Sequence, residues 1–434
     1  MMYNLRDQLP LQKNTIYALQ HIIYIAISAV SMPIVVGPML GLNQIEVAEM
    51  LQRTFLISGI ISILQVKLGH GFPIVEAPAG LWTGILTIMA GLVSSVGKDL
   101  TTLRTDLEGG LLTAGLVVML ITIMGMIPII TNLFTPVINS VLILLMVLQI
   151  SPSIVKGMLG ITKTNQVADF KVTAVFFTIV FIILAVNLFA KGFIQSISTL
   201  MGIGTGWILA ILLHLTNPID LTDKPLIFIP RVFAWGTPTF DLGITITCVL
   251  ASLILLSMTY TSIKSMSELL KEEVPTKQWN RSFLINGLST ALAGAFPIIA
   301  FMPYLSSTGF LAMTRVAARS PFVWAGGAMI ILGFFSPVGL LFASIPMSVG
   351  CGAMLVIFSL ILGQGLRELQ KTKITNRESF VIGISLLIGI GAMFLPTTTF
   401  QDLPSTLEYI LPNGLVDGII IALILDNILP KEEK

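Results

Sequence analysis

The stretch GHGFPIVEAPAGLWTGILTIMAG, residues 69–91, interrupts an otherwise apolar segment with two prolines and a carboxylate. Glu76 lies between Pro73 and Pro78, and proline lacks an amide donor and disfavours helix in the residue before it. We therefore expect extended backbone around Glu76, followed by a half-length apolar helix over residues 79–90. Irregular backbone is tolerated at membrane depth only beside a cavity, so the pattern favours a binding site at the start of the half-helix.

The composition places this stretch in an integral membrane protein. Of the 434 residues 55% are hydrophobic and 11% are charged, and the mean hydropathy is +0.93. Charged residues make up about a quarter of an ordinary soluble protein. Apolar runs of membrane-spanning length recur along the whole chain, which leaves no soluble domain of useful size. We interpret Cys248 and Cys351, both in apolar runs, as packing residues without a disulfide or metal role.

A second interrupted stretch, FMPYLSSTGFLAMTR at residues 301–315, repeats the plan of a proline, an extended piece, small residues and a half-helix. We count seven apolar segments before the polar stretch 217–241 and seven after it, and the interrupted segment is third in each half. This placement predicts an all-α polytopic membrane protein of 14 transmembrane segments, built as two inverted repeats of seven. Segments 3 and 10 are then half extended and half helical, with a binding site between them.

The loops carry an orientation signal. Lysines and arginines in loops assigned to the inner side outnumber those assigned to the outer side by roughly two to one. This bias predicts a cytoplasmic N-terminus, and an even number of segments places the C-terminus on the same side. The stretch 227–240, IFIPRVFAWGTPTF, alternates aromatic residues and prolines and predicts an extended excursion along the membrane surface.

Several stretches resemble the nucleobase–ascorbate transporter family, which includes uracil and xanthine permeases, and the resemblance covers nearly the whole chain. It implies a core domain at about residues 15–127 and 243–343 and a gate domain at about residues 130–215 and 347–429. It also implies a homodimer in the plasma membrane that takes up a purine or pyrimidine base with a proton or sodium ion by alternating access, without a cofactor. The stretches that carry it are ALQHIIYIA with Gln20 and His21, the stretch 227–240, RSFLINGLSTALAGAF at residues 281–296, and Gly309, Thr314 and Arg315.

The chain departs from this family at both acidic positions that bind the base. No Asp or Glu occurs between Asp241 and Glu268, which removes the acid of segment 8 and leaves Tyr260 as its replacement. In segment 10 the family's Glu or Gln becomes the pair Ser306 and Ser307, whose hydroxyls donate and accept hydrogen bonds but do not titrate near neutral pH.

The resemblance places further site residues near the two half-helix starts. Gly80 and Gly309 would let backbone amides meet carbonyl oxygens of a base, and Trp82 and Tyr304 would supply aromatic surface. The close approach of packed helices is the alternative explanation for the small residues, and packing is the alternative for the aromatics. Gln20 and His21 are expected to support the site, with helix packing as the alternative for His21.

Two ionisable residues remain for the coupling role. A charge at the bilayer centre costs about 3 kcal/mol or more unless it is paired or hydrated. We therefore hypothesise that Glu76 and Lys264 face each other across the cavity and take over the substrate-binding role of the missing carboxylates, and that protonation of Glu76 couples transport. The alternatives are a protonated structural Glu76 and a Lys264 paired with Glu268 one turn later. Asp417 and Asp426 in the last segment receive no role.

Other classes of function fit less well. An anion transporter of the sulfate-permease type shares the seven-plus-seven plan, and Lys264 with two half-helix N-termini would suit an anion, although Glu76 would repel one. An intramembrane enzyme is disfavoured because the apolar segments contain no HExxH or paired-aspartate motif. We expect a membrane-embedded transporter for a small nucleobase-like substrate that binds no nucleic acid.

Overall fold

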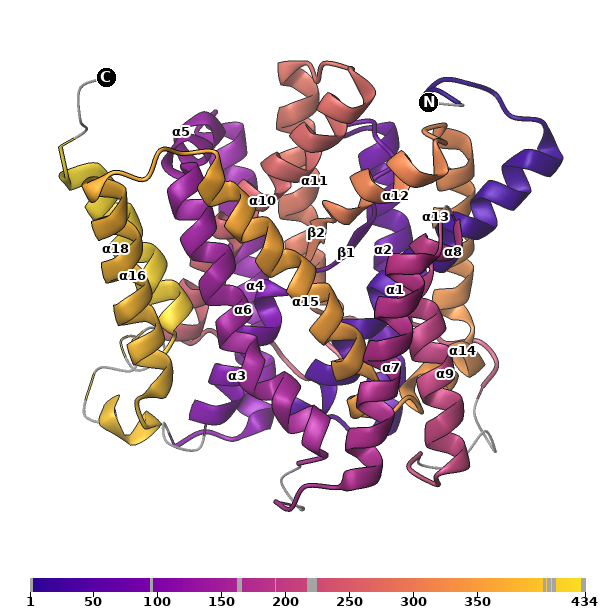
Figure 1. The fold of residues 1–434 in the computed structure, drawn as a ribbon, viewed down its shortest axis with the longest axis horizontal. Helices are drawn as coiled ribbons and strands as arrows, with labels where there is room; N and C mark the ends of the chain where they lie inside the picture. The colour runs from indigo at the N-terminus through magenta and orange to yellow at the C-terminus, as the bar shows by residue number, and fades with distance from the viewer. Residues whose placement is uncertain are drawn as a thin grey trace.

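The computed structural model describes residues 3–93, 97–161, 166–191, 193–216, 225–400, 403, 407 and 411–430. Two short strands, β1 (Glu76–Pro78) and β2 (Phe301–Pro303), lie among the helices that make up most of the described chain (Figure 1). In the first half the helices are α1 (Leu11–Met39), α2 (Gln44–Lys67), α3 (Leu81–Leu92), α4 (Leu100–Ile123), α5 (Ile127–Leu133), α6 (Pro136–Leu159), α7 (Phe170–Phe189), α8 (Phe193–Ser196) and α9 (Ser198–Leu212). In the second half they are α10 (Leu242–Leu270), α11 (Thr276–Ala295), α12 (Ser306–Thr314), α13 (Arg319–Phe334), α14 (Ser336–Ala343), α15 (Met347–Gln370), α16 (Asn376–Phe394), the 3-10 turn Thr397–Phe400 and α18 (Gly414–Ile428).

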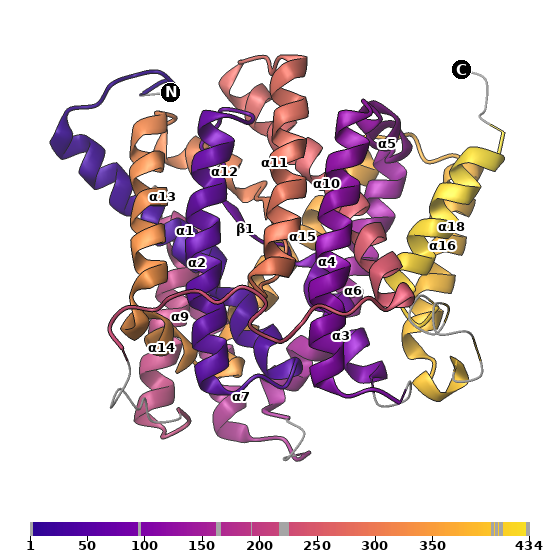
Figure 2. The same ribbon diagram turned by 180° about the vertical axis from the view of Figure 1, so that it is seen from behind.

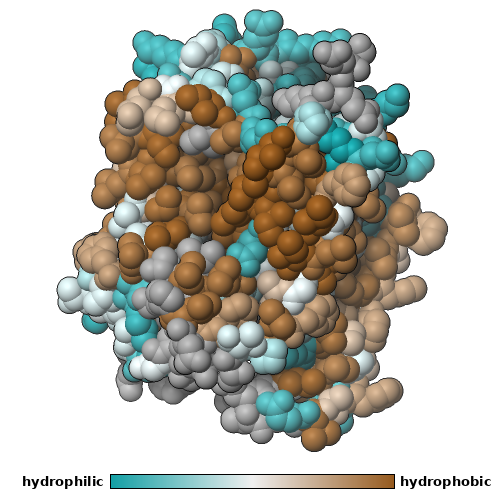
Figure 3. All heavy atoms as spheres, turned by 90° about the vertical axis from the view of Figure 1, so that its left-hand side faces the viewer, coloured by the Kyte–Doolittle hydropathy of each residue, from teal (hydrophilic) through white to brown (hydrophobic). Residues whose placement is uncertain are grey.

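Eight of the described helices are long and apolar enough to cross a membrane, which agrees with the expected all-helical membrane protein. Figure 3 shows that hydrophobic residues form a broad band on the side where α16 and α18 lie, between more hydrophilic ends. Phe380, Leu387 and Phe394 of α16 are exposed on the molecule's surface. Such a band suits contact with lipid chains. The described chain before α1 and the end of α18 lie at the same end of the molecule (Figures 1 and 2).

The helices pack in two groups. In the first group α2 packs on α13 and α14, α4 packs on α10 and α11, and α1 packs on α13. In the second group α15 packs on α6 and α7, α18 packs on α16 and α6, and α7 packs on α9. The strands make their helix contacts with the first group. The half-helix α12 contacts α10 of the first group and α8, which lies beside α7 and α9 of the second, and α3 lies between α1 of the first group and α6 of the second.

Local sequence explains where several of these helices begin. Asn43 accepts hydrogen bonds from the amides of Ile45 and Glu46, and the Glu46 side chain accepts from the amide of Asn43, so a capping box starts α2. Thr375 and Glu378 form the same arrangement at the start of α16.

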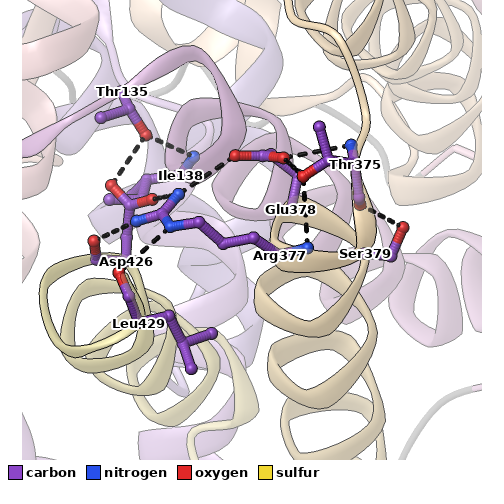
Figure 4. Close-up of polar contacts among 8 residues, drawn as sticks. All are labelled: Thr135, Ile138, Thr375, Arg377, Glu378, Ser379, Asp426 and Leu429. Atoms are coloured by element: carbon purple, nitrogen blue, oxygen red, sulfur yellow. Dashed lines mark hydrogen bonds and ion pairs between the residues drawn. The ribbon is translucent and has the colours of Figure 1, made fainter. Parts of the chain in front are cut away.

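Polar contacts between α16, α18 and the start of α6 fasten one end of the second group (Figure 4). Arg377 lies 2.9 Å from a carboxylate oxygen of Asp426 and donates to the main-chain carbonyl of Leu429. Thr135, the N-cap of α6, donates to the other carboxylate oxygen of Asp426. Asp426, which the sequence left without a role, is therefore a structural anchor for α18.

The stretch between α9 and α10 is extended, as predicted, over residues 227–231 and 238–241, but residues 232–237 form a turn; residues 217–224 lie outside the described residues. Figure 2 shows it crossing the molecule in front of α2 and α4. Its backbone bonds to three elements: Phe228 donates to Phe334, Phe233 donates to Ala295, and Thr239 donates to Thr105.

Two segments expected to be continuous helices are broken. The span predicted over residues 323–343 divides at Phe335, where the backbone is extended and Ile227 pairs with it. Pro337 follows two residues later and cannot donate to a continuing helix. The span predicted over residues 193–215 divides into α8 and α9.

Candidate functional site

The two interrupted segments meet as an antiparallel pair of strands at the centre of the molecule (Figure 1). Glu76 lies opposite Pro303, and Pro78 lies opposite Phe301. Two main-chain hydrogen bonds extend the ladder: the amide of Tyr304 donates to the carbonyl of Val75, and the amide of Ala79 donates to the carbonyl of Ala300, each at 2.9 Å. As predicted, each strand is followed by a short helix, α3 after β1 and α12 after β2.

Two serines of α2 satisfy the outer edge of β1. Ser58 donates to the carbonyl of Glu76, and the amide of Glu76 donates to the hydroxyl of Ser62. Both serines are buried, and they lie four residues apart on one face of α2. An unsatisfied main-chain group inside a membrane protein costs several kcal/mol, so this pair allows an extended strand at this depth. The spacing in SGIIS, residues 58–62, was the available sequence signal.

Tyr304 and Ser307 brace the site. The Tyr304 hydroxyl donates to the carbonyl of Pro78 at 2.7 Å, and the Ser307 hydroxyl accepts from the amide of Val75 at 3.1 Å. Ser307 is buried and committed to this backbone contact. Ser307 was predicted to bind the edge of a base. In this conformation its hydroxyl instead holds the backbone of the strand.

Ser306 and Gly309 are the accessible members of the predicted set. Both are exposed on α12, and a Cβ on Gly309 would meet nothing within 4 Å. The Tyr24 hydroxyl of α1 donates to Ser306 at 2.8 Å, and the Tyr24 ring stacks on Phe310 with 4.4 Å between ring centroids. An aromatic face, a hydroxyl and the positive end of a half-helix thus lie together beside open space.

Gly80, at the start of α3, lies against the second helix group. A Cβ on Gly80 would lie 2.8 Å from the ring of Phe358, a buried residue of α15. Trp82 is buried with Leu40 and Trp235 around a cavity of about 10 Å³, room for about one water. The α3 half-helix start is therefore covered in this conformation, and sequence reasoning did not identify Phe358.

Glu76 is completely buried beside His70, a residue that sequence reasoning missed. Nε2 of His70 lies 3.6 Å from Oε1 of Glu76, and neither side chain is exposed. Gly71 adopts a positive φ of 79°, a conformation that favours glycine, and this turn leads the chain from the end of α2 toward β1. The motif HGFPIVE, residues 70–76, was the sequence signal.

The structure corrects the expected pairing of Glu76 with Lys264. Lys264 is exposed on α10, and its ammonium lies 5.7 Å from the ring centroid of Tyr260. Tyr260 in turn stacks on Trp279 of α11 at 4.9 Å. Within the part of the chain that the structure describes, no ion pair joins Glu76 to Lys264 or Lys264 to Glu268. The helical position of Lys264 directs it outward, whereas Glu76 is enclosed.

Gln20 and His21 lie in α1 near the site but differ in exposure. Gln20 is half-buried, whereas His21 is buried between aromatic rings. The ring centroids of Phe310 and Phe322 are 5.2 and 5.3 Å from that of His21. His21 thus connects α1 with α12 and α13, which is the packing position that the sequence left open for it.

Paired interrupted segments that start two half-helices inside a multi-pass helical protein are typical of membrane transport proteins. Solved structures share the fold: the transmembrane domain of a cyanobacterium bicarbonate transporter, BicA, superposes with a TM-score of 0.60 at 14% identity, covering 97% of this chain and 99% of that one. The structure of SLC26A9 superposes with a TM-score of 0.68 at 12% identity, covering 96% of this chain and 66% of that one.

The family follows from the sequence comparison. The Xan_ur_permease model, described as "Permease family", matches residues 12–398, and the chain belongs to this family of transporters. A Bacillus subtilis (strain 168) protein named "Putative purine permease YwdJ" is 31% identical over 419 residues, which are 94% of each chain. The xanthine permease of the same organism is 23% identical over 425 residues, covering 96% of this chain and 94% of that one. The uric acid transporter UacT of Escherichia coli (strain K12) is 24% identical over 418 residues, covering 95% and 85%.

Proposed function

We propose that this permease is a secondary active transporter for a purine base such as xanthine or urate, and that it binds the base where α3 and α12 begin. The observation that carries the proposal is that the exposed Ser306 and Gly309 lie with the half-buried Tyr24, whose ring stacks on the buried Phe310, beside the paired strands. A base needs a stacking surface and a few hydrogen bonds along one edge, and these residues offer both. The names of the relatives support a purine.

Alternating access would move the two helix groups against each other. The first group corresponds to the core domain at about residues 15–127 and 243–343, and the second to the gate domain at about residues 130–215 and 347–429. Phe358 of α15 covers Gly80 of α3, so the ring must move before a base can reach the α3 amides. We propose that movement of the two helix groups away from each other opens the site. We also propose that the fold consists of two inverted repeats of seven segments.

The proposal includes a homodimer and coupling to a proton or a sodium ion. It also places both termini in the cytoplasm, supported by the basic bias of the loops and by the common position of the chain before α1 and the end of α18 at one end of the molecule (Figure 1). Likeness in fold to anion transporters concerns the architecture alone. The family match favours a purine over sulfate or bicarbonate.

Substrate exchange across liposomes tests this function. Purified protein is reconstituted with unlabelled xanthine inside, and uptake of radiolabelled xanthine or urate is measured without an ion gradient. We expect exchange that excess unlabelled purine suppresses and that sulfate and bicarbonate leave unchanged. Exchange of sulfate or bicarbonate without exchange of any base would contradict the proposal and favour the anion alternative.

A further inference from the structure

The neighbourhood of Glu76 contains a second titratable side chain that faces it. His70 follows the end of α2 and Glu76 opens β1, so the two side chains approach each other across the turn at Gly71. Both are fully enclosed, with 3.6 Å between Nε2 of His70 and Oε1 of Glu76. Among the residues that the structure describes, neither carboxylate oxygen of Glu76 has a hydrogen-bond partner, and neither has Nε2 of His70.

The hydrogen bonding of His70 fixes which nitrogen carries its proton. The amide of Phe72 donates to Nδ1 of His70 at 3.0 Å, so Nδ1 is an acceptor. A neutral imidazole with an acceptor at Nδ1 carries its hydrogen on Nε2. The Nε2–H group therefore faces the Glu76 carboxyl at a separation slightly longer than a hydrogen bond.

The charges around the pair favour a neutral His70. Arg319 of α13 donates from Nε to the carbonyl of Gly71 at 2.7 Å, which places a permanent cation beside the turn. Arg6 and Glu272 interact electrostatically with Arg319. Tyr304, which follows β2, donates its uncharged hydroxyl to Pro78 at the end of β1, and Lys264 of α10 is exposed. A second cation on His70 is disfavoured beside Arg319, so the exchangeable proton of the pair belongs to Glu76.

Burial of this kind links proton binding to conformation. An ionised carboxylate without partners in a protein interior costs several kcal/mol, so Glu76 holds a proton while it is enclosed and unpaired. A shift of less than 1 Å would let His70 donate to the carboxylate and stabilise it after the proton leaves. Glu76 is the first residue of β1, and α3 begins soon after β1 ends. A change in the protonation of Glu76 therefore affects the strand that leads into the proposed binding site.

We propose that His70 and Glu76 form the proton-binding site that couples proton movement to transport, with Glu76 as the proton carrier and His70 as its positioning residue. The proton comes from water on one side of the membrane, adds to the Glu76 carboxylate, and returns to water on the other side. This inference rests on the proposed purine transport, and it specifies the coupling ion and the residues that bind it.

Proton flux and substrate exchange separate the two claims. Liposomes containing the protein and the pH dye pyranine receive xanthine under an inward proton gradient, and xanthine exchange is measured separately without a gradient. For the wild type we expect gradient-driven accumulation and acidification of the lumen on xanthine addition. For Glu76→Gln we expect both signals to fall by about tenfold or more, whereas exchange stays within about twofold of wild type. Glu273→Gln, on an exposed loop, is the matched control and should match wild type in all three assays.

The role of His70 is tested with a measurement that would not change if His70 only packed against its neighbours. His70→Leu removes the donor, and His70→Gln keeps an amide N–H that can face Glu76. We expect the pH profile of accumulation, measured between about pH 5.5 and 8, to shift to higher pH for His70→Leu and to stay near wild type for His70→Gln.

Three results would overturn the proposal. The first is substrate-dependent acidification that persists in Glu76→Gln. The second is a loss of exchange in Glu76→Gln and in Glu76→Asp when both variants remain monodisperse, because the carboxylate is then part of substrate binding. The third is equal pH profiles for His70→Leu and wild type. A wild-type protein that exchanges no purine overturns the proposed function itself, and this coupling site with it.

Discussion

The hydroxyl of Tyr304 donates to the carbonyl of Pro78 at 2.7 Å, across the two strands that start the half-helices. The two residues are 226 positions apart, and this contact joins the end of β1 to the residue that follows β2. The contact fixes the starts of α3 and α12 relative to each other. The broken segments therefore act as one unit, although they belong to different halves of the chain.

Removal of this hydroxyl should loosen the pair of strands. Tyr304→Phe leaves the Pro78 carbonyl without its side-chain donor inside the protein, and we expect a loss of about 1–3 kcal/mol in the free energy of unfolding. Thermal unfolding of the detergent-purified protein measures it. Tyr260→Phe, which keeps its stack on Trp279, should unfold within about 0.5 kcal/mol of wild type. Equal stability of the two variants would show that the Tyr304 contact is dispensable.

The serines of α2 offer a second test of how the strand is held. Ser58→Ala and Ser62→Ala each remove a partner of the Glu76 backbone, and we expect a cost of about 1–3 kcal/mol for each substitution. Ser289→Ala is the matched control, because Ser289 is buried in α11 with a hydroxyl that has no partner. That control should be neutral or slightly stabilising. If all three variants lose the same free energy of unfolding, the loss comes from the burial of the serines and not from their hydrogen bonds.

Gly80 should tolerate no side chain as long as Phe358 covers it. A Cβ would lie 2.8 Å from the Phe358 ring, so Gly80→Ala should cost about 1–3 kcal/mol through overpacking and should slow exchange. Gly309→Ala, in open space, should leave stability within about 1 kcal/mol of wild type. Adding Phe358→Leu should recover part of the loss in Gly80→Ala, and a double-mutant cycle on unfolding measures this. Strict additivity of the two changes would contradict the contact.

Lys98, in the loop between α3 and α4, predicts a pH effect outside the membrane. Its ammonium donates to Asp106 at 2.7 Å and to Asp241 at 2.9 Å. Partial burial opposes the charge, but the hydrogen bonds to the two carboxylates outweigh it and raise the pKa of Lys98 above its ordinary value of 10.5. A raised pKa means that the stabilisation is complete below about pH 10.5 and is lost as the pH rises through the folded-state value.

Substitution of Lys98 makes this stabilisation measurable. Lys98→Met should lower stability by about 1 kcal/mol at neutral pH, and the difference from wild type should shrink above about pH 11. Lys373→Met, at an exposed lysine, is the control and should show no such change. A difference that is constant up to about pH 12 would exclude this titration as the cause.

The sequence was informative about backbone and less so about side-chain partners. The prolines around Glu76 and at Pro303 correctly predict both extended segments, because proline acts locally on the chain. The partner of Glu76 was not predicted, because it depends on the turn at Gly71 and on the direction of Lys264 from α10. The spacing of residues along a helix shows which of them share a face. It does not show which neighbouring element that face contacts.

The same distinction explains the other corrections. The break at Phe335 has one local signal, Pro337, but the extended backbone there also pairs with Ile227, more than a hundred residues away. Ser306 and Ser307 look equivalent in sequence, yet one is exposed and the other accepts a backbone hydrogen bond. Phe358 was missed because an apolar residue in an apolar helix carries no signal until its neighbour is known.

Ligand-induced thermal stabilisation tests the central claim most directly. The purified protein is heated with xanthine, urate, uracil, sulfate or bicarbonate, and the same panel is applied to Ser306→Ala. A ligand at about a hundred times its dissociation constant adds roughly 2.7 kcal/mol to the apparent stability. The account predicts stabilisation by xanthine or urate that is weaker for Ser306→Ala and absent with both anions. Stabilisation by sulfate or bicarbonate alone would contradict a purine site at the paired half-helices.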